Sequence, residues 1–118
     1  MNQHIQLAVL AGLVAVASSY GAEPNIDQGK KVYGTTCIVC HGKDGKGTIP
    51  GVPDLAVKNS RLMQDENVLF ERVRDGFQSS GSPLAMPPKG GNPTLTDTDI
   101  RDTLAYMRDS FPKKTGKK

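Results

Sequence analysis

The pentapeptide Cys37-Ile38-Val39-Cys40-His41 constrains this chain of 118 residues more than any other feature. Two thiols separated by two residues lie on one helical turn, where they can add to the two vinyl groups of a haem and form thioethers. The histidine that follows can then present its imidazole to one axial face of the iron. We therefore expect Cys37 and Cys40 to attach one haem c covalently, and we expect His41 to be the proximal iron ligand.

Other sites that use this cysteine spacing fit the chain less well. A redox-active CxxC disulfide normally begins a helix within a βαβ unit, and the sequence has no matching strand pattern. A zinc site would lack a fourth ligand, because two cysteines and one histidine supply only three. A structural disulfide between the cysteines would leave His41 without a role.

The N-terminal residues 1–22 have the composition of a signal peptide. An almost unbroken apolar run covers residues 5–17, and small or polar residues follow it. The run is too short for a comfortable membrane span, which favours cleavage between residues 17 and 22 over retention as an uncleaved anchor. Because c-type haem attachment in bacteria is completed outside the cytoplasmic membrane, we expect a periplasmic protein.

Residues 23–112 form the predicted domain, and residues 113–118 form a basic tail. The domain has few large apolar side chains and no tryptophan, so a core made of protein alone would be marginal. A covalently held haem would supply the missing apolar surface. We therefore expect the apoprotein to be largely unfolded.

The positive charge is concentrated at the C-terminus. Four of the 15 Lys and Arg residues lie in the last six positions, which leaves residues 23–112 with 11 positive and 12 negative side chains. Such a tail is either a solvated end or a contact for an acidic partner or an anionic membrane surface. Nothing in the charge distribution suggests nucleic acid.

The apolar spacing predicts an all-α fold with three to five short helices and long loops around the haem. The first helix begins with Asn25 or Asp27 as its cap and runs into the cysteine motif. A second covers residues 65–75 and stops at Gly76, and a third is capped by Thr96 with Asp99 and closed by Pro112. The apolar members of the first helix are Ile26, Val32 and Tyr33. One face of the second helix carries Val68, Leu69 and Val73, and one stripe of the third carries Ile100, Thr103, Leu104, Met107 and Phe111.

The two intervening segments, residues 42–53 and 77–93, are predicted loops because glycine and proline recur throughout them. No stretch alternates convincingly between polar and apolar residues, so we expect no sheet. Loops this long would count against a small domain, unless they wrap a cofactor.

The sixth iron ligand is predicted by elimination. His41 is the only histidine after the signal peptide, which leaves the methionines as strong candidates. We expect Met63 and Met107 to pack against other apolar residues. Met86 lies in a loop that two following prolines stiffen, so we expect it to be the distal ligand, with an open or water-bound face as the alternative.

Several segments together resemble the small bacterial class I c-type cytochromes, over nearly the whole chain after the signal peptide. The resemblance implies the cytochrome c fold, ligation of the iron by histidine and methionine, and transfer of single electrons between redox proteins. The matching segments are CIVCH at residues 37–41, AMPPKGG at residues 85–91, GKKVY at residues 29–33 and LAYM at residues 104–107.

The same resemblance gives roles to further residues. Gly29 would let the first and last helices approach where they cross. The carbonyl of Pro53 would accept the Nδ1 hydrogen of His41, with Pro50 as the competing choice, and Leu55 would line the haem pocket beside Pro53.

The chain departs from these relatives in two places. Some of them carry a cysteine pair just beyond the AMPPKGG loop, where this chain has Asn92 and Leu95. Residues 78–83 also lengthen the approach to Met86, either as a tolerated surface insertion or as a rim that contacts a specific partner.

With both axial positions filled, the site is that of a monomeric electron carrier and not of an enzyme. No second histidine is available as a general base, and no nucleophile motif is present. The alternatives are a sensor or peroxidase-like protein with a labile sixth ligand, and a dedicated electron-accepting subunit of a periplasmic dehydrogenase or oxidase.

Overall fold

The computed structural model describes residues 11–15 and 21–112. Most of the predicted signal peptide and all of the basic tail therefore lie outside the described residues. The described part contains the α-helices α1 (Ile26–Val32), α2 (Ile38–His41), α3 (Glu66–Asp75) and α4 (Asp97–Ser110). Three shorter turns join them, a π-helix at Tyr33–Cys37 and 3₁₀ turns at Arg61–Met63 and Pro88–Gly91.

The described residues form no strand, which confirms the all-α prediction for this part of the chain. The described residues have one isolated antiparallel β-bridge, which joins Phe77 and Met86. None of the helices found within these ranges has the length and apolar character that crossing a membrane requires.

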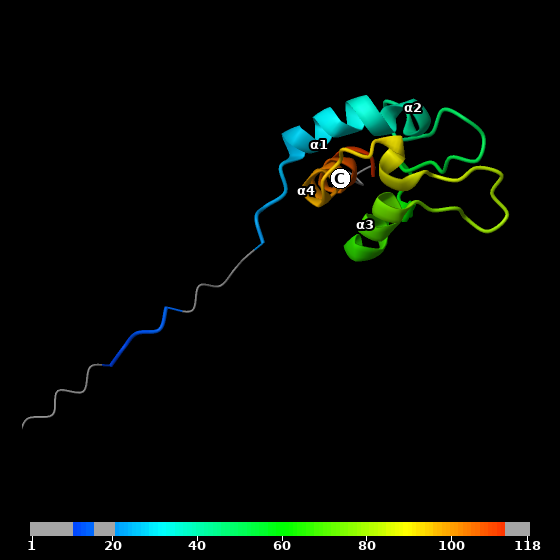
Figure 1. Cartoon of the computed structure of the whole chain (residues 1–118). Coiled ribbons are helices and arrows are strands. Elements are labelled where there is room, and N and C mark those ends of the chain that lie inside the picture. The colour runs from blue at the N-terminus through cyan, green and yellow to red at the C-terminus, as the bar shows by residue number, and fades with distance from the viewer. Residues whose placement is uncertain (1–10, 16–20, 113–118) are drawn as a thin grey trace, which may run out of the picture.

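The first three helical elements follow one another directly from Ile26 to His41 and carry the cysteine motif at their end (Figure 1). Asn25 is the cap, and not Asp27, because its side chain accepts a hydrogen bond from the backbone N–H of Gln28 at 3.0 Å. Of the three apolar residues expected in this helix, Val32 and Tyr33 are buried, whereas Ile26 is 41% exposed.

Helix α1 packs directly against α4, as Figure 1 shows. Gly29 lies at the contact, where an added Cβ would stand 2.0 Å from the carbonyl oxygen of Asp102. This confirms the predicted close approach, although α1 meets Asp102 and Thr103, just before the segment 104–107. The backbone N–H of Asn25 donates to Oδ1 of Asp102 at 2.8 Å and fastens the start of α1 to the same place.

Helix α3 is capped by Asp65 and ends at Gly76, whose φ of 84° only glycine adopts without strain. Its buried residues are Leu69 and Phe70, whereas Val68, which shares the predicted apolar face with Leu69, is 39% exposed. Successive residues are about 100° apart around a helix. The buried face includes the adjacent residues Leu69 and Phe70, so it is displaced away from Val68.

Helix α4 agrees with its prediction at both ends. The Thr96 hydroxyl accepts the N–H of Asp99 at 3.1 Å, and Oδ2 of Asp99 accepts the N–H of Thr96 at 3.0 Å, which is a complete capping box. The helix ends at Ser110, before Pro112. Its buried stripe joins the core formed by Tyr33, Leu55, Leu62, Leu69, Phe70, Ile100, Leu104, Met107 and Phe111.

The predicted loop at residues 77–93 is more ordered than expected. Phe77 and Met86 exchange backbone hydrogen bonds of 2.8 and 3.0 Å, and a 3₁₀ turn follows at Pro88–Gly91. Lys89 and Gly90 in that turn have φ values of 54° and 62°. Glycine tolerates this left-handed bend at Gly90, and the bend packs against the Thr36 methyl group of the π-helix.

Candidate functional site

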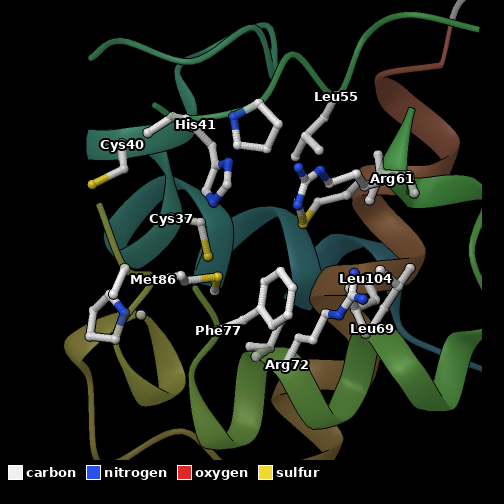
Figure 2. Close-up of a pocket in the computed structure, with 18 of the residues that line it drawn as sticks. Cys37, Cys40, His41, Leu55, Arg61, Leu69, Arg72, Phe77, Met86 and Leu104 are labelled. Carbon is white, nitrogen blue, oxygen red and sulfur yellow. The ribbon is translucent and has the colours of Figure 1, made fainter. Parts of the chain in front are cut away.

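All six residues predicted for the site line one cavity. The cavity lies between α2, α3, α4 and the two long loops, and its walls are mainly apolar (Figure 2). The predicted residues that line it are Cys37, Cys40, His41, Pro53, Leu55 and Met86. Core side chains complete the wall, among them Leu62, Leu69, Ile100, Leu104 and Met107.

The two thiols enter the cavity from the end of the N-terminal helical segment. Cys37 and Cys40 are both partly buried and are not joined to each other. Burial, with a smaller contribution from Cys40, raises the pKa of the Cys37 thiol to about 11. A dithiol oxidoreductase needs the opposite shift, because its attacking cysteine must be a thiolate near neutral pH. The environment of Cys37 therefore disfavours that reading of the motif.

His41 ends α2, and its imidazole points into the cavity, towards Cys37 and Met86 in Figure 2. Burial lowers the pKa of the ring, so the neutral form that binds metals is favoured. Its Nδ1 is buried and has no hydrogen-bond partner. The predicted bond to the carbonyl of Pro53, or to that of Pro50, is therefore not made in this structure.

Met86 lines the same cavity as Cys37 and His41 (Figure 2). The bridge to Phe77 fixes its backbone against the end of α3. Gly76 makes this contact possible, because an added Cβ there would stand 3.0 Å from the carbonyl oxygen of Met86. The Met86 backbone is thus held against the end of α3.

The other two methionines in the described domain differ from each other. Met107 is buried in the core, as predicted, and also lines the cavity. Met63 is 66% exposed and lies outside the cavity, so the prediction that it packs in the core is wrong. Leu62 turns inwards instead, because the 3₁₀ turn directs only one of the two neighbouring side chains to the core.

Two arginines face the cavity that the sequence analysis did not single out. Arg61 donates to the hydroxyl of Ser79, and Arg72 donates to Oε1 of Gln64 while its guanidinium stacks 4.0 Å above the Phe77 ring. The ion pairs found in the described part of the chain involve neither of them. Arg72 could have been found from its spacing of three after the buried Leu69, whereas Arg61 begins a 3₁₀ turn too short to show a periodic pattern.

The segment 78–83 contributes to the cavity wall. Ser79 and Ser82 line the cavity, and the Arg61 side chain ties Ser79 to the neighbouring turn. An added Cβ at Gly51 would meet Leu84 at 3.5 Å, so the two long loops touch each other beside the cavity mouth. The segment is therefore part of the wall around the site and not a remote surface insertion.

This donor set fits a covalently attached haem. An apolar slot flanked by two thiols matches the ring and its vinyl groups, and the His41 imidazole, kept neutral by burial, is a suitable iron ligand. A thioether is the second soft donor in the cavity. The two guanidinium groups match the carboxylates that a haem carries at one edge.

Comparisons with known proteins agree with this chemistry. The family model for cytochrome c matches residues 26–110. Cytochrome c-555 of Prosthecochloris aestuarii is 36% identical over 95 residues, which cover 79% of this chain and 95% of that protein. Cytochrome c-555 of Chlorobaculum tepidum is 34% identical over 100 residues, covering 85% of this chain and 90% of that protein.

A solved structure also resembles the fold. The crystal structure of cytochrome CL from Methylophaga aminisulfidivorans superposes with a TM-score of 0.56 at 26% identity and covers 71% of this chain. The match covers 51% of that structure, so this chain spans about half of its length. Bacterial class I cytochromes c are generally exported to the periplasm and pass electrons between redox partners. The chain belongs to the cytochrome c family, with haem c as its cofactor and haem-based electron transfer as its chemistry.

Proposed function

We propose that the protein is a monomeric, periplasmic carrier of single electrons. In this proposal Cys37 and Cys40 hold one haem c through thioether bonds, and His41 and Met86 are its axial ligands. The observation that carries it is the convergence of both thiols, the imidazole and the thioether on one apolar cavity. Pro53 and Leu55 contribute to the wall of that cavity.

The bound haem supplies a reversible one-electron couple between ferrous and ferric iron. His41 and Met86 keep both axial positions occupied, so the oxidation state changes with little rearrangement of the protein. The soft sulfur of Met86 favours the ferrous form and raises the reduction potential. The apolar walls exclude water, and Arg61 and Arg72 offer positive charge to the carboxylates of the cofactor.

The side of the cavity that carries the cysteines is the proposed route for the electron. Val39, between the two cysteines, is 72% exposed, so this edge of the site reaches the molecular surface. A redox partner that covers Val39 would approach the cofactor closely without opening the fold. A free carrier and an enzyme subunit would share this chemistry and differ only in how firmly the partner is held.

An enzymatic role is disfavoured in this proposal because no coordination position is left for a substrate. The test compares Met86→Ala with Met63→Ala, in which an exposed methionine outside the cavity is removed. Absorption spectra of the exported holoprotein are recorded in both oxidation states, and carbon monoxide is then added to the reduced protein. Wild type and Met63→Ala should not bind carbon monoxide, whereas Met86→Ala should bind it and have a lower reduction potential.

Two results would contradict the proposal. Binding of carbon monoxide by the wild-type protein would favour a sensor or an enzyme with a labile sixth ligand. An unchanged spectrum and potential in Met86→Ala would show that another group, such as Met107, occupies the sixth position.

A further inference from the structure

We propose that Thr36 and Asn92 are positioning residues that hold the Met86 loop, residues 77–92, against the helical segment that carries the cysteines. Their contact keeps the sixth iron position closed. The inference rests on the proposed function, because it takes Met86 as the ligand that the loop delivers.

A hydrogen bond joins the two residues across 56 positions of sequence. The Asn92 amide nitrogen donates to the Thr36 hydroxyl at 3.3 Å, in a partly buried place. The amide oxygen of Asn92 accepts from the backbone N–H and the hydroxyl of Thr94, at 3.2 and 2.6 Å. Because the oxygen is already used in this way, the amino group is the end of the amide that faces Thr36.

A packing contact reinforces the hydrogen bond. An added Cβ at Gly90 would stand 3.0 Å from the Thr36 methyl group, so the turn Pro88–Gly91 lies directly on this threonine. Gly90 and Lys89 both have positive φ. A non-glycine residue in the left-handed region costs free energy, so the surrounding contacts must favour this bend. Thr36 is the partner onto which the bend is packed.

The π-helix determines which threonine faces the loop. Within Tyr33–Cys37, the N–H of Ile38 bonds to the carbonyl of Tyr33, five residues back. The wider turn changes the direction of the side chains that follow it. The hydroxyl of Thr35 bonds within its own helix, to the carbonyls of Lys31 and Val32, whereas Thr36 lines the haem cavity and bonds to Asn92. Two adjacent residues of the same type therefore have different roles.

The contact complements the attachments on the other side of the loop. The bridge from Phe77 to Met86 and the bond from Arg61 to Ser79 tie the first part of the loop to α3 and to its neighbouring turn. Thr36 and Asn92 tie the second part to the helix that holds the thioethers. Movement of this second part away from the helix would carry Met86 with it, so the contact favours the closed site over the open one.

The experiment measures how tightly imidazole binds to the ferric holoprotein, because imidazole must displace Met86 from the iron. The variants are Thr36→Val, Asn92→Ala and the double variant, with Thr35→Val as the matched control. Loss of one net hydrogen bond should raise the association constant about three- to tenfold. The double variant should equal the larger single effect, because both changes remove the same contact, and Thr35→Val should stay within about twofold of wild type.

Thr36→Ser keeps the hydroxyl and should restore most of the wild-type affinity, which a loss of general stability would not predict. The inference is overturned if Thr36→Val binds imidazole no better than Thr35→Val, or if the effects of Thr36→Val and Asn92→Ala simply add. The Thr36 series gives the answer even if Asn92→Ala does not yield holoprotein. Met86→Ala separates the two proposals: if it leaves imidazole binding unchanged, the ligand assignment itself has failed.

Discussion

Gly29 is the residue whose size most directly sets the distance between α1 and α4. Gly29→Ala would place a methyl group 2.0 Å from the carbonyl oxygen of Asp102, so the two helices must separate. We expect the free energy of unfolding of the holoprotein to fall by about 3 kcal/mol, which is the upper end of the usual cost of adding a methyl group to a packed core. Denaturant unfolding followed by helical circular dichroism measures this loss.

Gly34→Ala is the matched control for that measurement. Gly34 is exposed in the following turn, and an added Cβ there meets nothing within 4 Å. Since alanine is favoured over glycine in helices by about 1 kcal/mol, this variant should be as stable as wild type or more stable. Equal losses in both variants would contradict the close approach of the two helices.

Arg72 should influence the reduction potential, because its guanidinium lines the haem cavity. The ion pairs of the described residues do not include Arg72, so no carboxylate in them offsets its charge. In Arg72→Gln, the lost positive charge favours ferric iron, and we expect the potential to fall by tens of millivolts. The haem carboxylate should also titrate at higher pH without its cationic neighbour, so the potential should decrease as pH rises through that range.

Potentiometric titration at several pH values measures both effects. Arg74→Gln is the control, since Arg74 is on the same helix but pairs with Asp75 outside the cavity. Equal shifts in Arg72→Gln and Arg74→Gln would mean that Arg72 acts only through the net charge of the protein.

At the scale of single elements, the capping box of α4 should make stability depend on pH. Hydrogen bonds from the backbone and side chain of Thr96 lower the pKa of Asp99 below its ordinary value of 3.8. The folded protein therefore holds the charged form more strongly than the unfolded chain does. Its contribution is complete above pH 3.8 and is lost as pH falls through the lower pKa of the folded state.

Asp99→Asn should reduce the free energy of unfolding by about 0.5 to 1 kcal/mol at neutral pH. This value is at the low end of the usual cost of losing a helix cap, because the carboxylate is exposed to solvent. The difference from wild type should shrink as the pH is lowered towards 2. Denaturant unfolding from pH 7 down to pH 2 measures it. Asp97→Asn, in the same helical turn but outside the box, should cost less at neutral pH, and a difference that persists at low pH would contradict the assignment.

At the scale of the whole molecule, the haem cavity and the hydrophobic core share the same side chains. Leu55, Leu62, Leu69, Ile100 and Leu104 belong to the core and also line the cavity. Without the cofactor, each of these residues would face a large apolar void instead of a packed neighbour. The folded state of the apoprotein therefore loses part of the burial that a domain of this size requires.

A double variant Cys37→Ser, Cys40→Ser cannot attach haem and should be largely unfolded. Its far-ultraviolet circular dichroism should show little helix, and heating should give no cooperative transition. Val39→Ala is the control, because it changes an exposed residue of the same motif but keeps both thiols. A cooperative unfolding transition in the double variant would show that the protein core is sufficient by itself.

The features that the sequence determined are those set by short-range chemistry. The spacing of Cys37, Cys40 and His41 is fixed by covalent connectivity, and the cap at Thr96 depends on residues three positions apart. The stop at Gly76 follows from backbone sterics alone. Such patterns can be read without knowing where the rest of the chain lies. The haem attachment and three of the four α-helices of the described residues were predicted on this basis, and the family was predicted from the resemblance of several segments.

Only the tertiary structure decided which side chains face the cavity and which face solvent. Val68 and Met63 are apolar yet exposed, and the charged Arg61 and Arg72 line an apolar site. The link between Thr36 and Asn92 joins residues 56 positions apart through a local change in helical winding. The physical reason is that such contacts depend on how helices and loops pack around one another. Local propensity and spacing carry no record of that arrangement.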